Sequence, residues 1–543
     1  MGRGLRRTAF DQASYDYWTG QYGVVNVKDF GAVGDGVHDD TQAIQQAINS
    51  MGTDGDLLSG TLIFPSGLYR ISKTINIDGG NVVGNSSTVY ENSNNIHVIM
   101  YGSLLPDSNI GDALFVHRII NGTFDLRVHG GGTDADRFLH LEDTFNANIN
   151  CYALQYAGTV LYHDNQTKSG GYAIHIENLI AYRCGQAFNL SGTKAFGQFS
   201  NVWDINPKSG SILDSMYDVS ILHYENSVNT TPANNASLVI SNSGSIHLGI
   251  IALGGSGTCT DGFLNLNNNN FDAVSTGVHI DQALIVGNSD SIGIYSYNSG
   301  LSIASAHTIG CKQALEVDQG VVTIDAHRDY NSLHALSLGA MVSGAGQIVT
   351  VKSAYYNSEG GSAIDVASNI GSSELSLSDI RVVNNNTTGT SGVATLSIAS
   401  SNARLTLRNI VDINPNASSA YSLSCVNYSQ IANPHELDSN SWARGVNYSS
   451  KGPYTTLAGE TAGNIYWIQP EQGPRKVFIA YFDGYENDTT TNQTITFPTA
   501  YSYTPTVATN STNLTVSAST TELTITSPDS TSTYSGVVEV VGL

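Results

Sequence analysis

The sequence predicts an all-β fold, a right-handed parallel β-helix (solenoid) with an N-terminal capping helix and a C-terminal antiparallel β-sandwich. Between residues 110 and 430, short segments with alternating apolar and polar residues recur at intervals of roughly 20–32 residues. Glycine, asparagine and serine turns separate these segments. After residue 463 the pattern changes to closely spaced strands joined by short polar turns, which is typical of a small antiparallel sandwich.

The N-terminal element is a short strand, a glycine-rich loop and then a helix over residues 41–50. Thr41 or Asp40 is suited to the N-cap, since each has a side-chain oxygen for the free amides of the first turn. Four apolar residues share one face at helical spacing, and they are Ala43, Ile44, Ala47 and Ile48. The helix therefore covers an apolar surface and exposes its opposite face.

The stretch VKDFGAVGDGVHDDTQAIQQAI, from residue 27, resembles the opening of the pectate-lyase-3-like family of right-handed parallel β-helices. The segment TLIFPSGLYRIS is similar to the first coil of that family. The resemblance implies that the helix caps the β-helix. It also implies that Asp35, Asp39 and Asp40 are turn and cap residues, an interpretation favoured over a metal site made of the same three.

In the repeat, six segments align on apolar residues that we expect to point inward: Ile280, Ile303, Ile324, Val351, Leu377 and Leu407. A single coil cannot bury its apolar face, whereas stacked coils bury one another's faces. A β-sandwich would also give closely spaced strands. The β-helix is favoured because the same pattern repeats in register after the cap.

These patterns divide the chain into five parts. They are an N-terminal arm over residues 1–23, the cap and first coils over 24–110, the parallel β-helix over 111–430, a linker over 431–462 and the C-terminal β-sandwich over 463–543.

The C-terminal runs FPTAYSYTPTV and LTVSASTTELTITSP resemble modules of phage tail fibres and tailspikes. With the cap, they make the whole chain similar to a phage tailspike. The resemblance implies a homotrimer in a virion that binds host cell-surface polysaccharide and cleaves it, with a non-enzymatic receptor-binding or structural virion protein as the alternative. We expect the aromatic and arginine-rich arm over residues 1–23 to attach the spike to other tail or baseplate proteins, with trimerisation or glycan binding in the sandwich.

Composition restricts the possible partners. With 23 basic and 46 acidic residues, the net charge of −23 argues against nucleic acid and anionic membranes. No run of 18 apolar residues predicts membrane insertion, and the five scattered cysteines have no zinc spacing. We therefore expect no metal and no cofactor. The start lacks the apolar core of a signal peptide, as expected for a virion part that is released by lysis and acts outside the cell.

The candidate site lies on the residues that follow the inward positions of the repeat. Asp325 is expected to act as acid or base, with Asp281 or Asp329 as the second carboxylate, and Glu316 is a further candidate for that role. Two carboxyls that flank the scissile bond are what glycoside hydrolysis requires. The expected sugar-binding side chains come from neighbouring coils, and they are His307, His327, Arg328, Tyr355 and Arg381.

Two alternatives stay open at this site. The same residues can be solvated surface groups joined by ion pairs between coils, such as Asp325 with Lys352. A lyase would use Arg328 or Arg381 as its base, and the chain has neither the GHG nor the RIK motif of polygalacturonase-type β-helices. A glycosidase is favoured over a lyase, and the enzymatic role itself is left open.

Overall fold

The computed structural model describes most of the chain. The described residues are 23–52, 58–79, 95–108, 110–130, 136–142, 144–164, 172–192, 195–269, 277–339, 347–358, 361–367, 373–384, 396–399, 403–413, 423–425, 446–448, 464–468, 476–486, 493–497, 500–509, 515–526 and 533–542. The predicted arm, apart from Gly23, and most of the predicted linker lie outside these residues.

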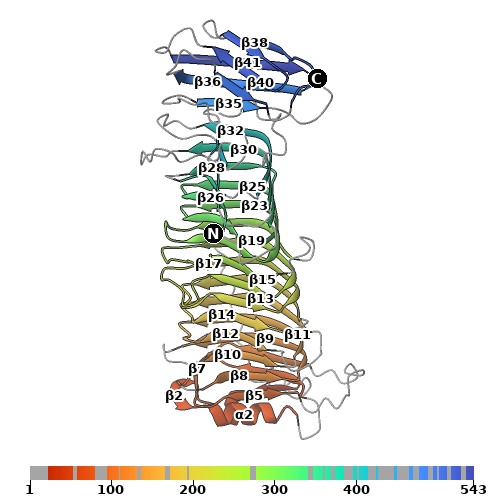
Figure 1. Cartoon of the computed structure of the whole chain (residues 1–543). Helices are drawn as coiled ribbons and strands as arrows, with labels where there is room; N and C mark the ends of the chain where they lie inside the picture. The colour runs from red at the N-terminus through yellow and green to blue at the C-terminus, as the bar shows by residue number, and fades with distance from the viewer. Residues whose placement is uncertain are drawn as a thin grey trace, which may run out of the picture. The chain divides into compact units, whose positions relative to one another are not determined.

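The chain forms two compact units, Met1–His307 (unit 1) and Thr308–Leu543 (unit 2), and the boundary falls within β23 (Ser299–Ile309). In unit 1, parallel strands stack coil upon coil (Figure 1). The first row of strands, called the groove sheet below, contains β1 (Val24–Asn26), β3 (Gly60–Phe64), β6 (Ile96–Met100), β9 (Ile120–His129), β11 (Phe145–Leu154), β13 (Tyr172–Tyr182), β15 (Ala195–Ile205), β17 (Tyr217–Ser227), β19 (Gly244–Gly254) and β21 (Val278–Val286).

A second parallel sheet closes each coil of unit 1. Its strands are β5 (Ile75–Asp78), β8 (Asp112–His117), β10 (Arg137–Glu142), β12 (Thr159–Asp164), β14 (Gln186–Ser191), β16 (Ser211–Asp214), β18 (Leu238–Ser241), β20 (Leu264–Asn267) and β22 (Ile292–Tyr297). The short strands β2 (Asp35–Asp39), β4 (Leu68–Ile71) and β7 (Ser103–Pro106) pair beside the first coils. This is the predicted parallel β-solenoid.

The core of unit 1 is a column of apolar side chains that point into the coils from successive strands. Its members are all buried, and they are Phe124, Ile149, Ile176, Phe199, Ile221, Leu248 and Ile280. Each side chain of this size stabilises the fold by about 1.5–3 kcal/mol when it is fully buried. Because residues alternate across a strand, the neighbours of each core residue point outward, and this alternation creates the surface described below.

The cap is the helix α2 (Thr41–Asn49), which buries Ile44, Ala47 and Ile48 as predicted. Asp40 occupies the N-cap position, but its side chain makes no capping hydrogen bond. Its buried carboxylate instead accepts hydrogen bonds from the amides of Val33 and Gly34, at 2.7 and 3.0 Å, and so holds the glycine loop.

Asp39 supplies the capping interactions that were expected of Asp40 or Thr41. Its carboxylate accepts hydrogen bonds from the amide and hydroxyl of Thr41 and from the hydroxyl of Ser72. Burial raises the pKa of Asp39, but the hydrogen bonds from Ser72 and Thr41 outweigh this and lower it to about 2. The predicted turn roles are thus confirmed for Asp35, which accepts hydrogen bonds from the amides of Val37 and His38, and for Asp40 in the glycine loop. The capping hydrogen bond expected of the Asp40 side chain is wrong, because that carboxylate turns back to the loop.

Unit 2 repeats the coil architecture. One sheet contains β25 (Gly320–Tyr330), β27 (Gln347–Val351), β28 (Ala354–Ser358), β30 (Ser373–Asn384) and β32 (Ala403–Ile413). The second contains β24 (Gln313–Val317), β26 (His334–Leu338), β29 (Ile364–Val366), β31 (Leu396–Ile398), β33 (Leu423–Cys425) and β34 (Val446–Tyr448).

The strands after residue 463 pair antiparallel, as the change of sequence pattern predicts. One sheet has the order β35 (Asn464–Ile468), β36 (Lys476–Glu486), β41 (Thr533–Gly542) and β38 (Thr506–Thr509). The other has the order β37 (Gln493–Thr496), β40 (Glu522–Thr526) and β39 (Thr515–Ala518). Over the described residues, no helix has the length and apolar character needed to cross a membrane.

Candidate functional site

A continuous row of polar side chains runs along the outer face of the groove sheet in unit 1. Its members lie opposite one another on successive strands, one position before each inward core residue. From β3 to β21 this polar row consists of Thr61, His97, Thr123, Asn148, His175, Gln198, Ser220, His247 and His279. Neighbouring strands are about 4.8 Å apart, so the row offers a hydrogen-bonding group at nearly every step.

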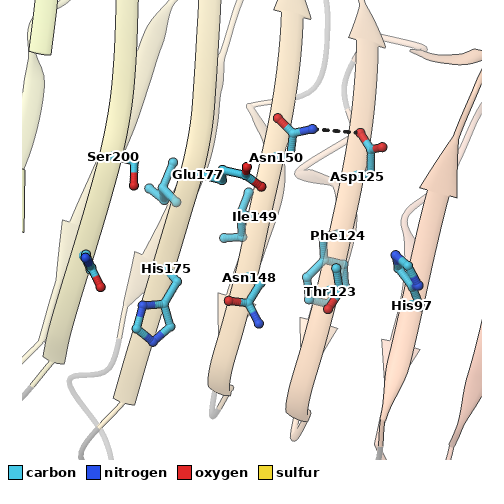
Figure 2. A pocket seen from close by; sticks show the side chains of 12 residues that line it. His97, Thr123, Phe124, Asp125, Asn148, Ile149, Asn150, His175, Glu177 and Ser200 are labelled. Atoms are coloured by element: carbon cyan, nitrogen blue, oxygen red, sulfur yellow. Dashed lines mark hydrogen bonds between the residues drawn. The ribbon is translucent and has the colours of Figure 1, made fainter. Parts of the chain in front are cut away.

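The part of the row from His97 to Gln198 lines a groove of about 420 Å³ (Figure 2). An adjoining hollow of about 600 Å³ shares His97, Thr123 and Asn148 and continues to Gly60 and Gly23. The groove is lined mainly by hydroxyl, amide, imidazole and carboxylate groups. Such a surface suits a ligand that is rich in hydroxyl groups.

Two carboxylates lie beside the row on the same face. Asp125 on β9 accepts a hydrogen bond from the side-chain amide of Asn150 on β11, at 3.3 Å, and exposed Glu177 lies on the next strand, β13 (Figure 2). The carboxylates are thus two strands apart, about 9.6 Å at the backbone. Inverting glycosidases place their two carboxyls about 6.5–9.5 Å apart, which leaves room for the attacking water.

A register shift occurs where Glu177 projects. β11 and β13 pair Ile149 with Ile176, but the next pair joins Asn150 with Asn178, so Glu177 is the additional residue of a β-bulge. A bulge bends its strand and redirects a side chain, and bulges are over-represented beside active sites. The shift accounts for the placement of Glu177 at the edge of the groove.

Residues in the left-handed conformation begin several strands of the groove sheet. Asn121 and Asn146 have φ values of 61° and 54°, and each lies two positions before its row member, Thr123 or Asn148. Asparagine tolerates this conformation better than most residues. The side-chain amide of Asn146 donates to the carbonyl oxygen of the Asn121 side chain at 2.7 Å, which ties the two corners together and fixes where the row begins on each strand.

In unit 2, the structure aligns the predicted outward column as the sequence expects. Arg328 lies opposite Tyr355, Tyr355 lies opposite Arg381, and the rings of Tyr330 and Tyr355 are 5.6 Å apart. Asp325 is exposed and forms an ion pair with Lys352 at 2.7 Å, which is the surface-group alternative left open from the sequence. The catalytic role of Asp325 stays a prediction.

Two predicted members of this site do not lie on the surface. Asp329 is 0% exposed and His327 is 2% exposed. The hydroxyls of Thr308 and Ser332 each donate to Asp329 at 2.7 Å, and burial raises its pKa to about 6. The reason is the strand alternation itself, because both residues fall on positions that point into the coil. In this conformation neither contacts a polymer on the outer surface.

In unit 1, Asp281 is half-exposed and contacts His247 and His279, each at 3.0 Å. His307, at the end of unit 1, is half-buried on β23. Glu316 in unit 2 lies on β24, in the other sheet, and its pKa is raised to about 7, first by burial and then by the charge of Asp318.

The sequence reasoning missed Asp125 and Glu177 because the alignment of the repeat began at Ile280. Phe124 and Ile176 are inward core residues of earlier coils, and the next residues are Asp125 and Glu177. They therefore occupy in their coils the position that Asp325 occupies after Ile324. Extending the alignment toward the N-terminus would have identified both carboxylates.

A protein-family model matches the N-terminal third of the chain. Residues 24–205 match the family model described as "Rhamnogalacturonase A/epimerase, pectate lyase-like". The match spans the cap and the whole groove. This part of the chain is therefore similar to pectate-lyase-like proteins, and the fold that it opens is a parallel β-solenoid.

Particular relatives match over short segments. Mannuronan C5-epimerase AlgE1 of Azotobacter vinelandii is 57% identical over 47 residues, 9% of this chain and 3% of that protein. Plasmin and fibronectin-binding protein A of Streptococcus pneumoniae is 47% identical over 51 residues, 9% of this chain and 7% of that protein. The chain thus spans under a tenth of the length of these curated relatives.

Solved structures to which this chain is similar include a phage tailspike and a glucanase. The tailspike gp61 of Pseudomonas phage phi297 is 12% identical, with 96% of this chain and 98% of that chain covered and a TM-score of 0.33. The GH87 α-1,3-glucanase of Streptomyces thermodiastaticus is 15% identical, with 73% and 70% covered and a TM-score of 0.36. With TM-scores this low, neither similarity supports a function for this chain.

Proposed function

We propose that this chain is a tailspike-type protein that binds a polysaccharide along the polar row of unit 1 and hydrolyses it between Asp125 and Glu177. The observation that carries the proposal is the groove itself. Hydroxyl, amide and imidazole groups lie at regular strand spacing, with two carboxylates on one side. A linear glycan also repeats its hydroxyl groups at regular intervals, so successive sugars can meet successive strands.

The charge of the chain indicates which glycan fits. The net charge of −23 opposes the approach of a strongly anionic polymer. The row members beside the groove, Thr123, Asn148 and Gln198, are neutral donors and acceptors. A neutral or weakly charged polysaccharide is therefore the proposed substrate class.

The roles of the two carboxylates follow from their spacing. Separated by about two strand spacings, they suit inversion, in which one carboxyl protonates the leaving oxygen and the other activates a water. Asn150 lies between them, and its side-chain amide donates a hydrogen bond to Asp125 at 3.3 Å, which orients that carboxylate. We assign the oriented Asp125 as the base and the exposed Glu177 as the acid.

The direct test incubates the full chain with a panel of bacterial surface polysaccharides and measures new reducing ends and glycan binding. Cleavage with inverted anomeric configuration, lost in Glu177→Gln and Asp125→Asn, is the expected result. Binding without cleavage would leave the polysaccharide-binding role and refute the hydrolase. Unsaturated products would indicate a lyase.

The assembly and viral context belong to the same proposal. We expect a homotrimer that attaches to the virion through residues 1–23 and acts on the host cell surface. Light scattering at micromolar concentration should give the trimer mass, and deleting residues 1–23 should leave a folded, glycan-binding protein that no longer joins particles. A folded monomer would contradict this arrangement.

A further inference from the structure

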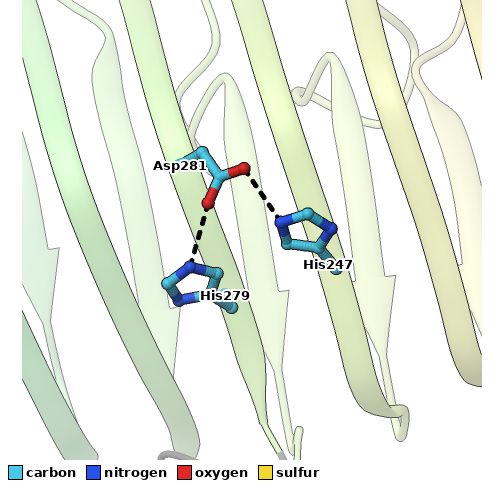
Figure 3. Close-up of side chains that lie close together, drawn as sticks. All are labelled: His247, His279 and Asp281. Atoms are coloured by element: carbon cyan, nitrogen blue, oxygen red, sulfur yellow. Dashed lines mark hydrogen bonds and ion pairs between the residues drawn. The ribbon is translucent and has the colours of Figure 1, made fainter.

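Three side chains from two adjacent strands of unit 1 converge at one point on the groove sheet (Figure 3). His247 on β19 lies directly opposite His279 on β21, and their rings stack with centroids 5.5 Å apart and planes inclined by 15°. Asp281 lies two residues after His279, so strand alternation places it on the same face.

The donor atoms of these residues are close enough to share an ion. The carboxylate of Asp281 reaches both imidazoles, with one oxygen 3.0 Å from Nε2 of His247 and the other 3.0 Å from Nε2 of His279. One ligand atom of each residue lies within 4.8 Å of the other two. A Zn²⁺ ion bonded at about 2.0–2.2 Å to each would need only small rotations of the three side chains.

The surroundings of the cluster permit those rotations and support the required tautomer. The side chains of His247, His279 and Asp281 are 41%, 44% and 48% exposed, so no packed core resists their movement. The hydroxyl of Ser220, the preceding row member, is 3.4 Å from Nδ1 of His247. It can accept a hydrogen bond from Nδ1–H, and in that tautomer Nε2 carries no proton and can bind a metal. Supporting groups around metal-bound histidines commonly act in this way.

We propose that His247, His279 and Asp281 form a binding site for a divalent transition metal, with Zn²⁺ as the best fit. Two imidazoles and one carboxylate are the ligand set of zinc sites that keep a fourth position open. Because the side chains are half-exposed, the open position faces solvent at the end of the polar row and can take an oxygen ligand. The alternative is a hydrogen-bonded pair of histidines around Asp281 with no ion.

The spacing of these residues in the sequence does not predict the site. His247 and Asp281 are 34 residues apart, and only the register between β19 and β21 brings them together. The cluster also changes the interpretation of Asp281, predicted from the sequence as a second catalytic carboxylate. With an imidazole on each oxygen, it is placed to bind a metal rather than to exchange protons with a sugar.

The test titrates the metal-stripped full chain with Zn²⁺ by calorimetry and with Co²⁺ by visible absorption, which reports the coordination geometry. One Zn²⁺ per chain is expected, with binding that weakens as pH falls and the imidazoles protonate. His247→Ala, His279→Ala and Asp281→Asn should each weaken binding by at least about tenfold, and Ser220→Ala by about tenfold.

The matched control is His223→Ala, a histidine on the neighbouring strand β17 outside the cluster. It should bind Zn²⁺ as the wild type does, and circular dichroism should show that every variant is folded. Absence of Zn²⁺ binding in the wild type, or wild-type affinity in Asp281→Asn, would overturn the three-ligand site. Neither readout depends on glycan cleavage, so the result is independent of the proposed hydrolase activity.

Discussion

The position before each inward core residue is filled differently in the two units. In unit 1 it carries long polar side chains such as His97, Asn148, His175 and Gln198, and these line the groove. In unit 2 the same position carries short hydroxyl residues, which lie opposite one another as Thr323, Thr350, Ser376 and Thr406. The same backbone register therefore produces two surfaces that differ in the length of these side chains.

The carboxylates of the two surfaces differ in the partners that they contact. In unit 1, Asp125 and Glu177 face the groove, and Asp125 accepts a hydrogen bond from the neutral side-chain amide of Asn150. In unit 2, Asp325 is paired with the cation of Lys352. A carboxylate beside neutral donors is available to a sugar, whereas an ion-paired one must first lose its partner. The comparison favours unit 1 for catalysis, and four experiments test it.

The largest expected effect is on cleavage. Replacing Glu177 by Gln removes a titratable group at nearly constant volume, and the loss of general acid catalysis should lower turnover by about 10²–10⁴-fold while glycan binding survives. Asp325→Asn is the matched change in unit 2, at the position that also follows an inward residue. Reducing-end release by both variants decides between the units, because a large loss in Asp325→Asn alone would reverse the comparison.

The second expected effect is on the pH dependence of stability, through the buried carboxyls that both units contain. Asp204 in unit 1 accepts a hydrogen bond from the hydroxyl of Ser211 at 3.0 Å and one from Tyr224 at 3.3 Å. Burial nevertheless raises its pKa from 3.8 to about 7. The neutral form is favoured by folding, so this stabilisation is fully present below pH 3.8 and is lost as pH rises through about 7.

Asp204→Asn should therefore flatten the pH dependence of stability. At about 1.4 kcal/mol per pKa unit, the wild type should lose a few kcal/mol of unfolding free energy between pH 4 and pH 8 through Asp204, on the order of 4 at most. The variant should not show this loss. Urea unfolding at pH 4, 6 and 8 measures it, with Asp290→Asn, an exposed aspartate, as the charge-matched control. Asp329→Asn tests the same effect in unit 2, with a pKa of about 6 and hence a smaller total change in stability. Parallel curves for Asp204→Asn and wild type would refute the assignment.

The fold was predictable because burial in the coils requires an apolar residue at every second position of a strand, and this alternation can be seen in the sequence. Val351, Leu377 and Leu407 lie opposite one another as aligned from the sequence, since a slip by one residue would turn each apolar side chain to solvent. The helix face of α2 was predictable for the same reason. Asp40 was assigned the wrong partner, because its hydrogen bonds go back to Val33 and Gly34 in a loop that local rules do not describe.

The site was less predictable because it depends on register and curvature. Nothing in the sequence near Glu177 indicates that it is the additional residue of a bulge, which becomes visible only when β11 and β13 are paired. The burial of Asp329 and His327 shows the converse. A dense run of polar residues in a sequence attracts attention as a site, yet half of such a run points inward in a strand.

The third experiment tests the polar row with one substitution made in both units. Thr123→Val removes a hydroxyl from the groove wall at nearly constant shape, and Thr350→Val makes the same change at the same position in unit 2. A hydrogen bond of about 1 kcal/mol corresponds to a roughly fivefold loss of glycan affinity, expected for Thr123→Val alone. Equal losses in the two variants, measured by calorimetry, would place glycan on both surfaces.

The smallest expected effect is that of Lys352→Ala, which tests whether the ion pair of Asp325 is merely a surface contact. The two side chains are 58% and 52% exposed, so water screens their attraction. Such pairs contribute about 0–1 kcal/mol, and the variant should unfold at nearly the wild-type urea concentration. The same variant also frees the carboxylate of Asp325 from its cation. If Asp325 were the catalytic group restrained by Lys352, cleavage would rise or its pH profile would shift in Lys352→Ala, whereas an unchanged rate and profile would leave catalysis with the groove of unit 1.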